Sequence, residues 1–208
     1  MTAALSRLGT ALDRLLDGLR AVSSVCVWIG GGLLMLLTLG ITAEVIMRSA
    51  FNHSFTGMDE LGGYVLAIVS ALAFTEGLFH RSHIRIDVIH AMLPRWGRAV
   101  LDLLALLSVV VFFGLLLWYA HLLLARSWAL DARSVSPLSV RIWIPQGLWF
   151  LGLAFFVATS VVLLVRNLLA LALGDLATIT REIGIKGAED EIEEERSLSA
   201  AARGEARA

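Results

Sequence analysis

The residues best suited to chemistry lie in one short charged segment, His80-Arg-Ser-His-Ile-Arg-Ile-Asp87. Histidines beside carboxylates can ligate metals, and histidines that face each other between membrane helices can hold haem. Here His80, His83 and His90 lack the defined spacing of an oxygen-activating metal site, and His121 is predicted to lie at the opposite membrane face. We therefore predict that the chain binds no cofactor and no metal.

Glu76 lies one helical turn before His80. On a helix the two side chains share a face, and a carboxylate at membrane depth costs free energy unless it is paired. A proton relay would need further titratable groups deeper in the membrane, and the centres of the apolar stretches contain none. We interpret Glu76 and His80 as a structural pair, with a proton relay as the less favoured alternative.

Two other charged groups mark the ends of apolar stretches. Glu44 and Arg48 are four residues apart, so they can neutralise each other at the membrane surface or contact a partner. Thr56 and Asp59 resemble a capping box, and Asp59 and Glu60 suit the positive end of a helix dipole. A contact between these two carboxylates and a partner is the alternative.

Four apolar stretches must position these residues. Hydrophobic residues make up 58% of the 208-residue chain, charged residues make up 17%, and the mean hydropathy is +0.79. A helix needs about 20 apolar residues to cross a bilayer, and lipid leaves no alternative partner for the backbone. We predict an all-α membrane protein with a single four-helix transmembrane domain over residues 22–165, with spans at about 22–47, 61–79, 103–124 and 142–165.

The segments that flank this domain are more polar. Leucines recur at three- and four-residue spacing in residues 1–21, which predicts an N-terminal amphipathic helix at the membrane surface or an extension of the first span. The first apolar run exceeds the length of a signal-peptide core, so we expect it to be retained. Residues 166–208 are predicted to form a polar, acidic C-terminal tail that is partly disordered.

Arginine bias predicts the orientation. Arginines gather before the first span and in the loop between the second and third spans, whereas the first loop has only Arg48. Cytoplasmic loops of membrane proteins are enriched in basic residues. The third loop, with three arginines, weakens the contrast. The pattern favours a cytoplasmic N-terminus, second loop and C-terminus.

Small and helix-breaking residues give two further expectations. Gly30, Gly31 and Gly32 remove side chains from the first span and predict close approach of another helix. Pro145 falls in the first turn of the last span, where its missing N–H costs least.

Common catalytic and transport motifs are absent from the sequence. It has no Walker loop, GxSxG, HExxH or CxxC, and its single cysteine, Cys26, excludes an intrachain disulfide. It also lacks the pair of broken helices that marks the binding site of many transporters. We predict that the chain is not an enzyme and moves no solute alone. An integral-membrane haem or metal redox subunit and a free-standing small transporter are the alternatives.

Several short motifs, taken in order, resemble one family. They are Glu44-x3-Arg48-x2-Phe51-Asn52, Asp59-Glu60, Glu76-x6-His83-Ile-Arg85-Ile-Asp87 and Ile144-Pro145-Gln146. Together they resemble the small permease (DctQ-type) subunit of TRAP transporters, the tripartite ATP-independent periplasmic transporters. The resemblance covers roughly residues 40–165. One departure is that Gly57 and Met58 precede the acidic pair, where the family commonly has a nearby tryptophan.

The resemblance implies a function and partners. The small subunit would brace a large membrane subunit that carries the solute and sodium sites, in the bacterial inner membrane. A periplasmic binding protein would deliver the solute, which we expect to be an organic acid; no nucleic acid is involved. The implied motif or subunit-contact residues are Glu44, Arg48, Asp59, Glu60, Glu76, His83, Arg85, Asp87 and Pro145. We expect Arg85 and Asp87 to lock their loop against neighbouring span ends or the large subunit.

Overall fold

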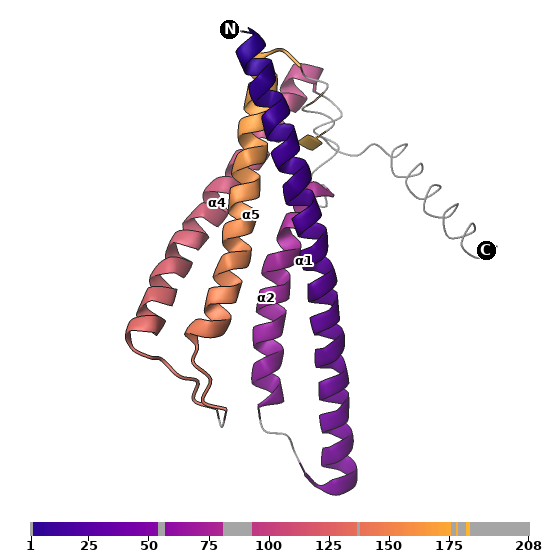
Figure 1. Ribbon diagram of the computed structural model, residues 1–208, viewed down its shortest axis with the longest axis vertical. Coiled ribbons are helices and arrows are strands. Elements are labelled where there is room, and N and C mark those ends of the chain that lie inside the picture. Colours follow the sequence, from indigo (N-terminus) through magenta and orange to yellow (C-terminus); the bar gives the residue numbers. More distant parts are fainter. Residues whose placement is uncertain are drawn as a thin grey trace, which may run out of the picture.

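The structure is a computed structural model that describes residues 2–53, 57–80, 93–136, 138–175, 178, 182 and 183. Each of the four helices among these residues is long and apolar enough to cross a membrane. This confirms the predicted all-α membrane fold. The helices are α1 (Thr2–Phe51), α2 (Met58–Phe79), α4 (Arg95–Ala129) and α5 (Trp143–Ala172) (Figure 1).

Successive helices run in opposite directions (Figure 1). The beginnings of α1 and α4 and the ends of α2 and α5 therefore lie together, at what we call the N-terminal end. The opposite end, where the chain passes from α1 to α2 and from α4 to α5, is called the hairpin end. Helix α5 packs against α1, α2 and α4, and α1 also packs against α2. Helix α5 is thus the centre of the bundle.

Helix boundaries extend beyond the apolar stretches. Helix α1 continues without a break from Thr2, so the segment before the first predicted span extends that span's helix. Helix α4 begins eight residues before its predicted span because Pro94, in an extended conformation, stands at its N-cap. The first turns of α4 carry Arg98 and Asp102. Their charges lower the local hydropathy, so hydropathy alone does not predict a membrane helix there.

Helix α1 buries a narrow seam. Its buried residues recur at seven-residue spacing, namely Gly9, Leu16, Ser23, Gly30 and Glu44. The one missing position in this series is the half-buried Leu37. A seven-residue repeat keeps one seam against neighbouring helices in a left-handed arrangement. The rest of the α1 surface within the span stays largely uncovered by this chain.

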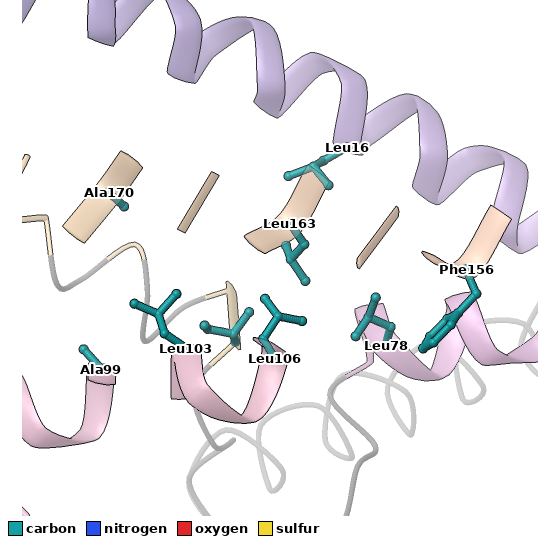
Figure 2. Packing of buried hydrophobic residues seen from close by; sticks show 9 residues of the cluster. Leu16, Leu78, Ala99, Leu103, Leu106, Phe156, Leu163 and Ala170 are labelled. Carbon is teal, nitrogen blue, oxygen red and sulfur yellow. The ribbon is translucent and has the colours of Figure 1, made fainter. Parts of the chain in front are cut away.

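The core of the bundle lies among α2, α4 and α5 and reaches α1 through Leu16. Figure 2 shows Leu16, Leu163 and Leu78, from three different helices, around this cluster. Towards the middle of the bundle, the rings of Phe113 and Phe156 meet edge to face with centroids 4.6 Å apart. Edge-to-face contact is a favoured geometry for aromatic pairs.

Two glycines illustrate how closely the helices approach each other. A Cβ atom on Gly152 of α5 would lie 2.8 Å from Ala71 Cβ and 3.2 Å from the Ala71 carbonyl carbon in α2. A Cβ atom on Gly30 of α1 would lie 3.0 Å from Val69 Cγ1. The predicted close packing is therefore confirmed at Gly30. Within this chain it does not occur at Gly31 and Gly32, where a Cβ atom would meet no atom within 4 Å, because successive helical residues point in different directions.

Candidate functional site

A hydrogen-bonded group at the N-terminal end centres on Glu76. Ser23 Oγ of α1 donates to Glu76 Oε2 at 2.5 Å, and His80 Nε2 lies 3.0 Å from Glu76 Oε1. The predicted pairing of Glu76 with His80 is confirmed. Ser23 was not anticipated, and it makes the carboxylate a link between α1 and α2. The side chain of Glu76 is 21% exposed, so these contacts satisfy a carboxylate that is largely withdrawn from solvent.

A second link at the same end joins α1 to α5. Arg166 Nε donates to Asp13 Oδ1 at 2.5 Å, and Arg166 Nη2 donates to Asp13 Oδ2 at 3.3 Å. Both carboxylate oxygens are therefore engaged by one guanidinium, the geometry that arginine favours. The arginine side chain is 11% exposed and the aspartate side chain is 45% exposed. This pair ties α1 to the central helix α5.

The chain after α5 returns to the bundle at this end. Asn167 Nδ2 donates to Glu182 Oε2 at 3.0 Å and to the Leu163 carbonyl oxygen at 2.9 Å. Ile183 is buried in the core cluster that also contains Leu16. Residues 182 and 183 therefore belong structurally to the helical bundle.

At the hairpin end, Glu60 plays the corresponding role. Tyr64 Oη donates to Glu60 Oε1 at 2.5 Å, and Ser136 Oγ donates to Glu60 Oε2. Ser136 lies in the connection between α4 and α5, so Glu60 ties the start of α2 to that connection. Asp59 is exposed.

The predicted capping box at the start of α2 is wrong. The N-cap is Gly57, with a φ of 99° and no side-chain hydrogen bond to the helix. Glycine tolerates this left-handed conformation, and a Cβ there would also collide with Leu138. The helix consequently begins one residue later than a cap at Thr56 would require. The Glu60 side chain is then directed into contacts with Tyr64 and Ser136.

The remaining described motif residues occupy the expected elements. Arg48 Nη1 lies 3.9 Å from Glu44 Oε1, which confirms the predicted i,i+4 pair, with Arg48 61% exposed. Pro145 is buried in the first turn of α5, as predicted. Other motif and loop residues lie outside the described part of the chain, namely Thr56, His83, Arg85, Asp87 and His90, as does the acidic run at 189–195.

The described residues contain no group of three or more histidine, cysteine, aspartate or glutamate side chains placed to hold a metal ion. Their ionic contacts cluster at the two ends of the bundle. The middle is filled by apolar and aromatic side chains. This arrangement can join helices and proteins, and it offers no charged path through the described bundle.

The outward face of α1 carries more small residues than that of α4. On α1, exposed small or hydroxyl-bearing residues alternate with bulky ones such as Trp28 and Met35; the small ones include Ser24, Gly31, Thr38, Thr42 and Ser49. On α4 the exposed side chains are bulky, and they include Leu104, Val111, Phe112, Leu115 and Trp118. Small residues are typical of contacts between membrane helices, whereas bulky apolar residues suit lipid.

Sequence reasoning missed the contacts that join the helices. Ser23, Ser136 and the pair Asp13–Arg166 were not singled out. The heptad phase shared by Leu16, Ser23 and Gly30 could have indicated which face of α1 is buried. Asp102, which is buried at the start of α4, lies just outside its predicted span and drew no attention.

Comparison with known proteins identifies the family. The model of the DctQ component of tripartite ATP-independent periplasmic transporters matches residues 37–170, which is more than half of the chain. No match is found among curated proteins. The matched family is a transporter component rather than an enzyme family, and the four apolar helices are those of a multi-pass membrane protein. The chain belongs to the DctQ family, the small membrane subunits of TRAP transporters.

Proposed function

We propose that this chain braces the large permease subunit of a TRAP transporter during sodium-driven uptake of an organic acid. A periplasmic binding protein would deliver the solute, and the large subunit would carry the solute and sodium sites. The family match carries the proposal. In this account the small subunit supplies a rigid membrane-embedded support and takes no part in solute binding.

The internal contacts support a bracing role. Glu76 and Arg166 join three helices at the N-terminal end, and Glu60 joins α2 to the α4–α5 connection at the hairpin end. Fixing both ends of a bundle limits the sliding of one helix on another. Transport through this bundle would instead require a hydrated path or broken helices.

We further propose that the outward face of α1 contacts the large subunit. Helix α1 buries only a narrow seam in its own bundle, and its uncovered face includes the small residues Gly31 and Thr38 beside the bulky Trp28 and Met35. Thr38 Oγ1 donates to the Leu34 carbonyl oxygen at 2.8 Å, so its hydroxyl is already satisfied and can enter an apolar interface. Small residues allow two membrane helices to approach closely, which gives this face the better fit to a protein partner.

For the orientation, we propose that the N-terminal end lies in the cytoplasm of a bacterial inner membrane. The antiparallel arrangement brings the start of α1, the end of α2 and the end of α5 to one side (Figure 1). The arginine bias of the N-terminal segment and second loop then selects that side as cytoplasmic. Reporter fusions after residue 93 and at the C-terminus should show that both positions lie in the cytoplasm. A periplasmic location of either reporter would contradict the proposal.

Reconstitution tests the function directly. Proteoliposomes with the small and large subunits, binding protein and an inward sodium gradient should accumulate organic acid. Omitting this chain should abolish uptake, and liposomes holding this chain alone should show none. Uptake by this chain alone would show that it is a free-standing transporter. Uptake at the full rate without it would refute the bracing role.

A further inference from the structure

A hollow of about 490 Å³ lies at the N-terminal end, where α1 passes the ends of α2 and α5. Part of its described lining is apolar, from Leu16, Leu78, Phe79 and Leu163. The rest is charged, from Asp13, Asp17, Arg20 and Glu182. A hollow with an apolar wall and charges of both signs matches an amphiphile better than an inorganic ion.

Two of its charged side chains, those of Asp17 and Arg20, can form further hydrogen bonds. Asp13 is held by Arg166, and Glu182 accepts a hydrogen bond from Asn167. Arg20 lies over the ring of Phe79, 5.1 Å from the centroid, in a cation–π contact. Among the described residues, neither Asp17 nor Arg20 has an ion-pair partner. The hollow therefore presents one guanidinium and one carboxylate that are available to a ligand.

The hollow lies at the depth of lipid headgroups. The first and second spans were predicted to start at residue 22 and to end at residue 79, which places Arg20 and Phe79 beside the membrane surface. Arginine and aromatic side chains are common at this depth. Leu15 and Val22 on the same stretch of α1 are about half exposed and continue the apolar surface towards the bilayer.

We propose that this hollow binds the headgroup of a zwitterionic phospholipid with a primary ammonium, the phosphatidylethanolamine class. Arg20 donates hydrogen bonds to the phosphate oxygens, and Asp17 accepts hydrogen bonds from the ammonium group. Leu16, Leu78 and Leu163 contact the glycerol and the first methylenes of the acyl chains.

The charge pattern discriminates against other occupants. An anionic lipid headgroup without an ammonium offers Asp17 no donor, and the Asp17 carboxylate would repel a second negative charge placed beside Arg20. A quaternary ammonium, as in phosphatidylcholine, has no N–H to donate to Asp17. A lysine or arginine side chain from a partner protein would leave Arg20 without an anion and would be repelled by it.

Native mass spectrometry of the full-length chain can test the proposal. The chain would be exchanged into detergent with equimolar phosphatidylethanolamine, phosphatidylcholine and phosphatidylglycerol that carry identical acyl chains. One phosphatidylethanolamine should be retained roughly tenfold over either competitor, the ratio expected for one charge-assisted hydrogen bond. Equal retention of the three lipids, or preference for phosphatidylglycerol, would overturn the proposal.

Two variants and a matched control locate the lipid. Asp17→Asn should remove the preference for phosphatidylethanolamine over phosphatidylcholine, and Arg20→Gln should lower retention of both. Arg14→Gln removes an exposed arginine from the same helix outside the hollow. This control should leave both the lipid preference and the amount of lipid retained unchanged. Circular dichroism checks that all three variants are folded. An unchanged preference in Asp17→Asn, or loss of the lipid when the large subunit is bound, would refute the assignment.

Discussion

Helices α1 and α5 are both long apolar helices of one bundle, yet they bury very different parts of their surfaces. In the most apolar window of α1, 6% of the residues are buried inside the chain, against 33% for α5. The buried residues of α5 include glycine, threonine, serine and asparagine, among them Gly152, Thr159, Ser160 and Asn167. The buried surface of the central helix therefore contains small and polar residues, which pack closely against its neighbours.

The difference assigns separate roles to the two helices. Helix α5 contacts all three other helices, so its packing determines whether the bundle forms. Helix α1 is attached by its seam, in which one residue in every seven is buried, and by the hydrogen bonds of Asp13 and Ser23. Its remaining surface is available for lipid or for a second protein. Substitutions should therefore affect folding on α5 and assembly on α1.

The largest effect on folding is expected at Gly152. Gly152→Ala would place a methyl group against the backbone of Ala71, which cannot move aside as a flexible side chain could. We expect a loss of about 1–3 kcal/mol in the free energy of unfolding, the usual cost of overpacking. Unfolding of the purified chain in mixed detergent micelles, followed by circular dichroism, measures this quantity.

Gly147→Ala is the matched control, because it lies on α5 and a Cβ there meets no atom within 4 Å. This variant should be neutral or stabilised by up to about 1 kcal/mol through helix propensity. Equal destabilisation by the two substitutions would contradict the central packing role of the Gly152 contact.

An intermediate effect is expected at the ion pair that joins the two helices. A double-mutant cycle with Asp13→Asn and Arg166→Gln should give a coupling free energy of about 1–2 kcal/mol, between the values of exposed and buried pairs. Asp131 and Arg133 form an ion pair at 3.4 Å in which each side chain is more than half exposed, and Arg141 lies equally close to Asp131. This pair serves as the control, with coupling of about 0–0.5 kcal/mol. Similar coupling in the two pairs would show that burial of Arg166 does not strengthen the link.

The smallest effect is expected in the seam of α1. Gly30→Ala would bring a methyl group to 3.0 Å from a Val69 methyl, and that side chain can shift. Gly31→Ala meets nothing and gains helix propensity. We expect Gly30→Ala to be less stable than Gly31→Ala by about 0.5–1 kcal/mol in the same unfolding assay. The reverse order would place the seam on the wrong face of α1.

Sequence patterns predicted the elements better than the contacts between them. Continuous hydropathy identified each membrane helix, and the i,i+4 pairs Glu44–Arg48 and Glu76–His80 followed from helix geometry alone. The seam of α1 was hidden because leucines occur on every side of the helix, so hydrophobicity does not separate buried from lipid-facing positions. The contacts of Glu76 with Ser23 and of Glu60 with Ser136 join residues distant in sequence, so they depend on helix register.

The start of α2 shows a limit of predicting a helix boundary from a short sequence motif. Thr56 and Asp59 have the spacing of a capping box, but Gly57 accepts a left-handed conformation that moves the helix start by one residue. The contact of Leu138 with Gly57 reinforces this start from the α4–α5 connection. A motif of four residues could not anticipate that tertiary contact.

Recovery of the large permease subunit with two tryptophan variants tests most directly whether α1 is the docking helix. Gly31→Trp on α1 and Gly114→Trp on α4 add the same bulk at positions where a Cβ meets no atom within 4 Å. Both lone chains should keep wild-type helicity. We predict that Gly31→Trp reduces co-purified large subunit at least roughly tenfold, equivalent to about 1.4 kcal/mol, while Gly114→Trp retains it. Wild-type recovery with Gly31→Trp, or loss confined to Gly114→Trp, would contradict the account.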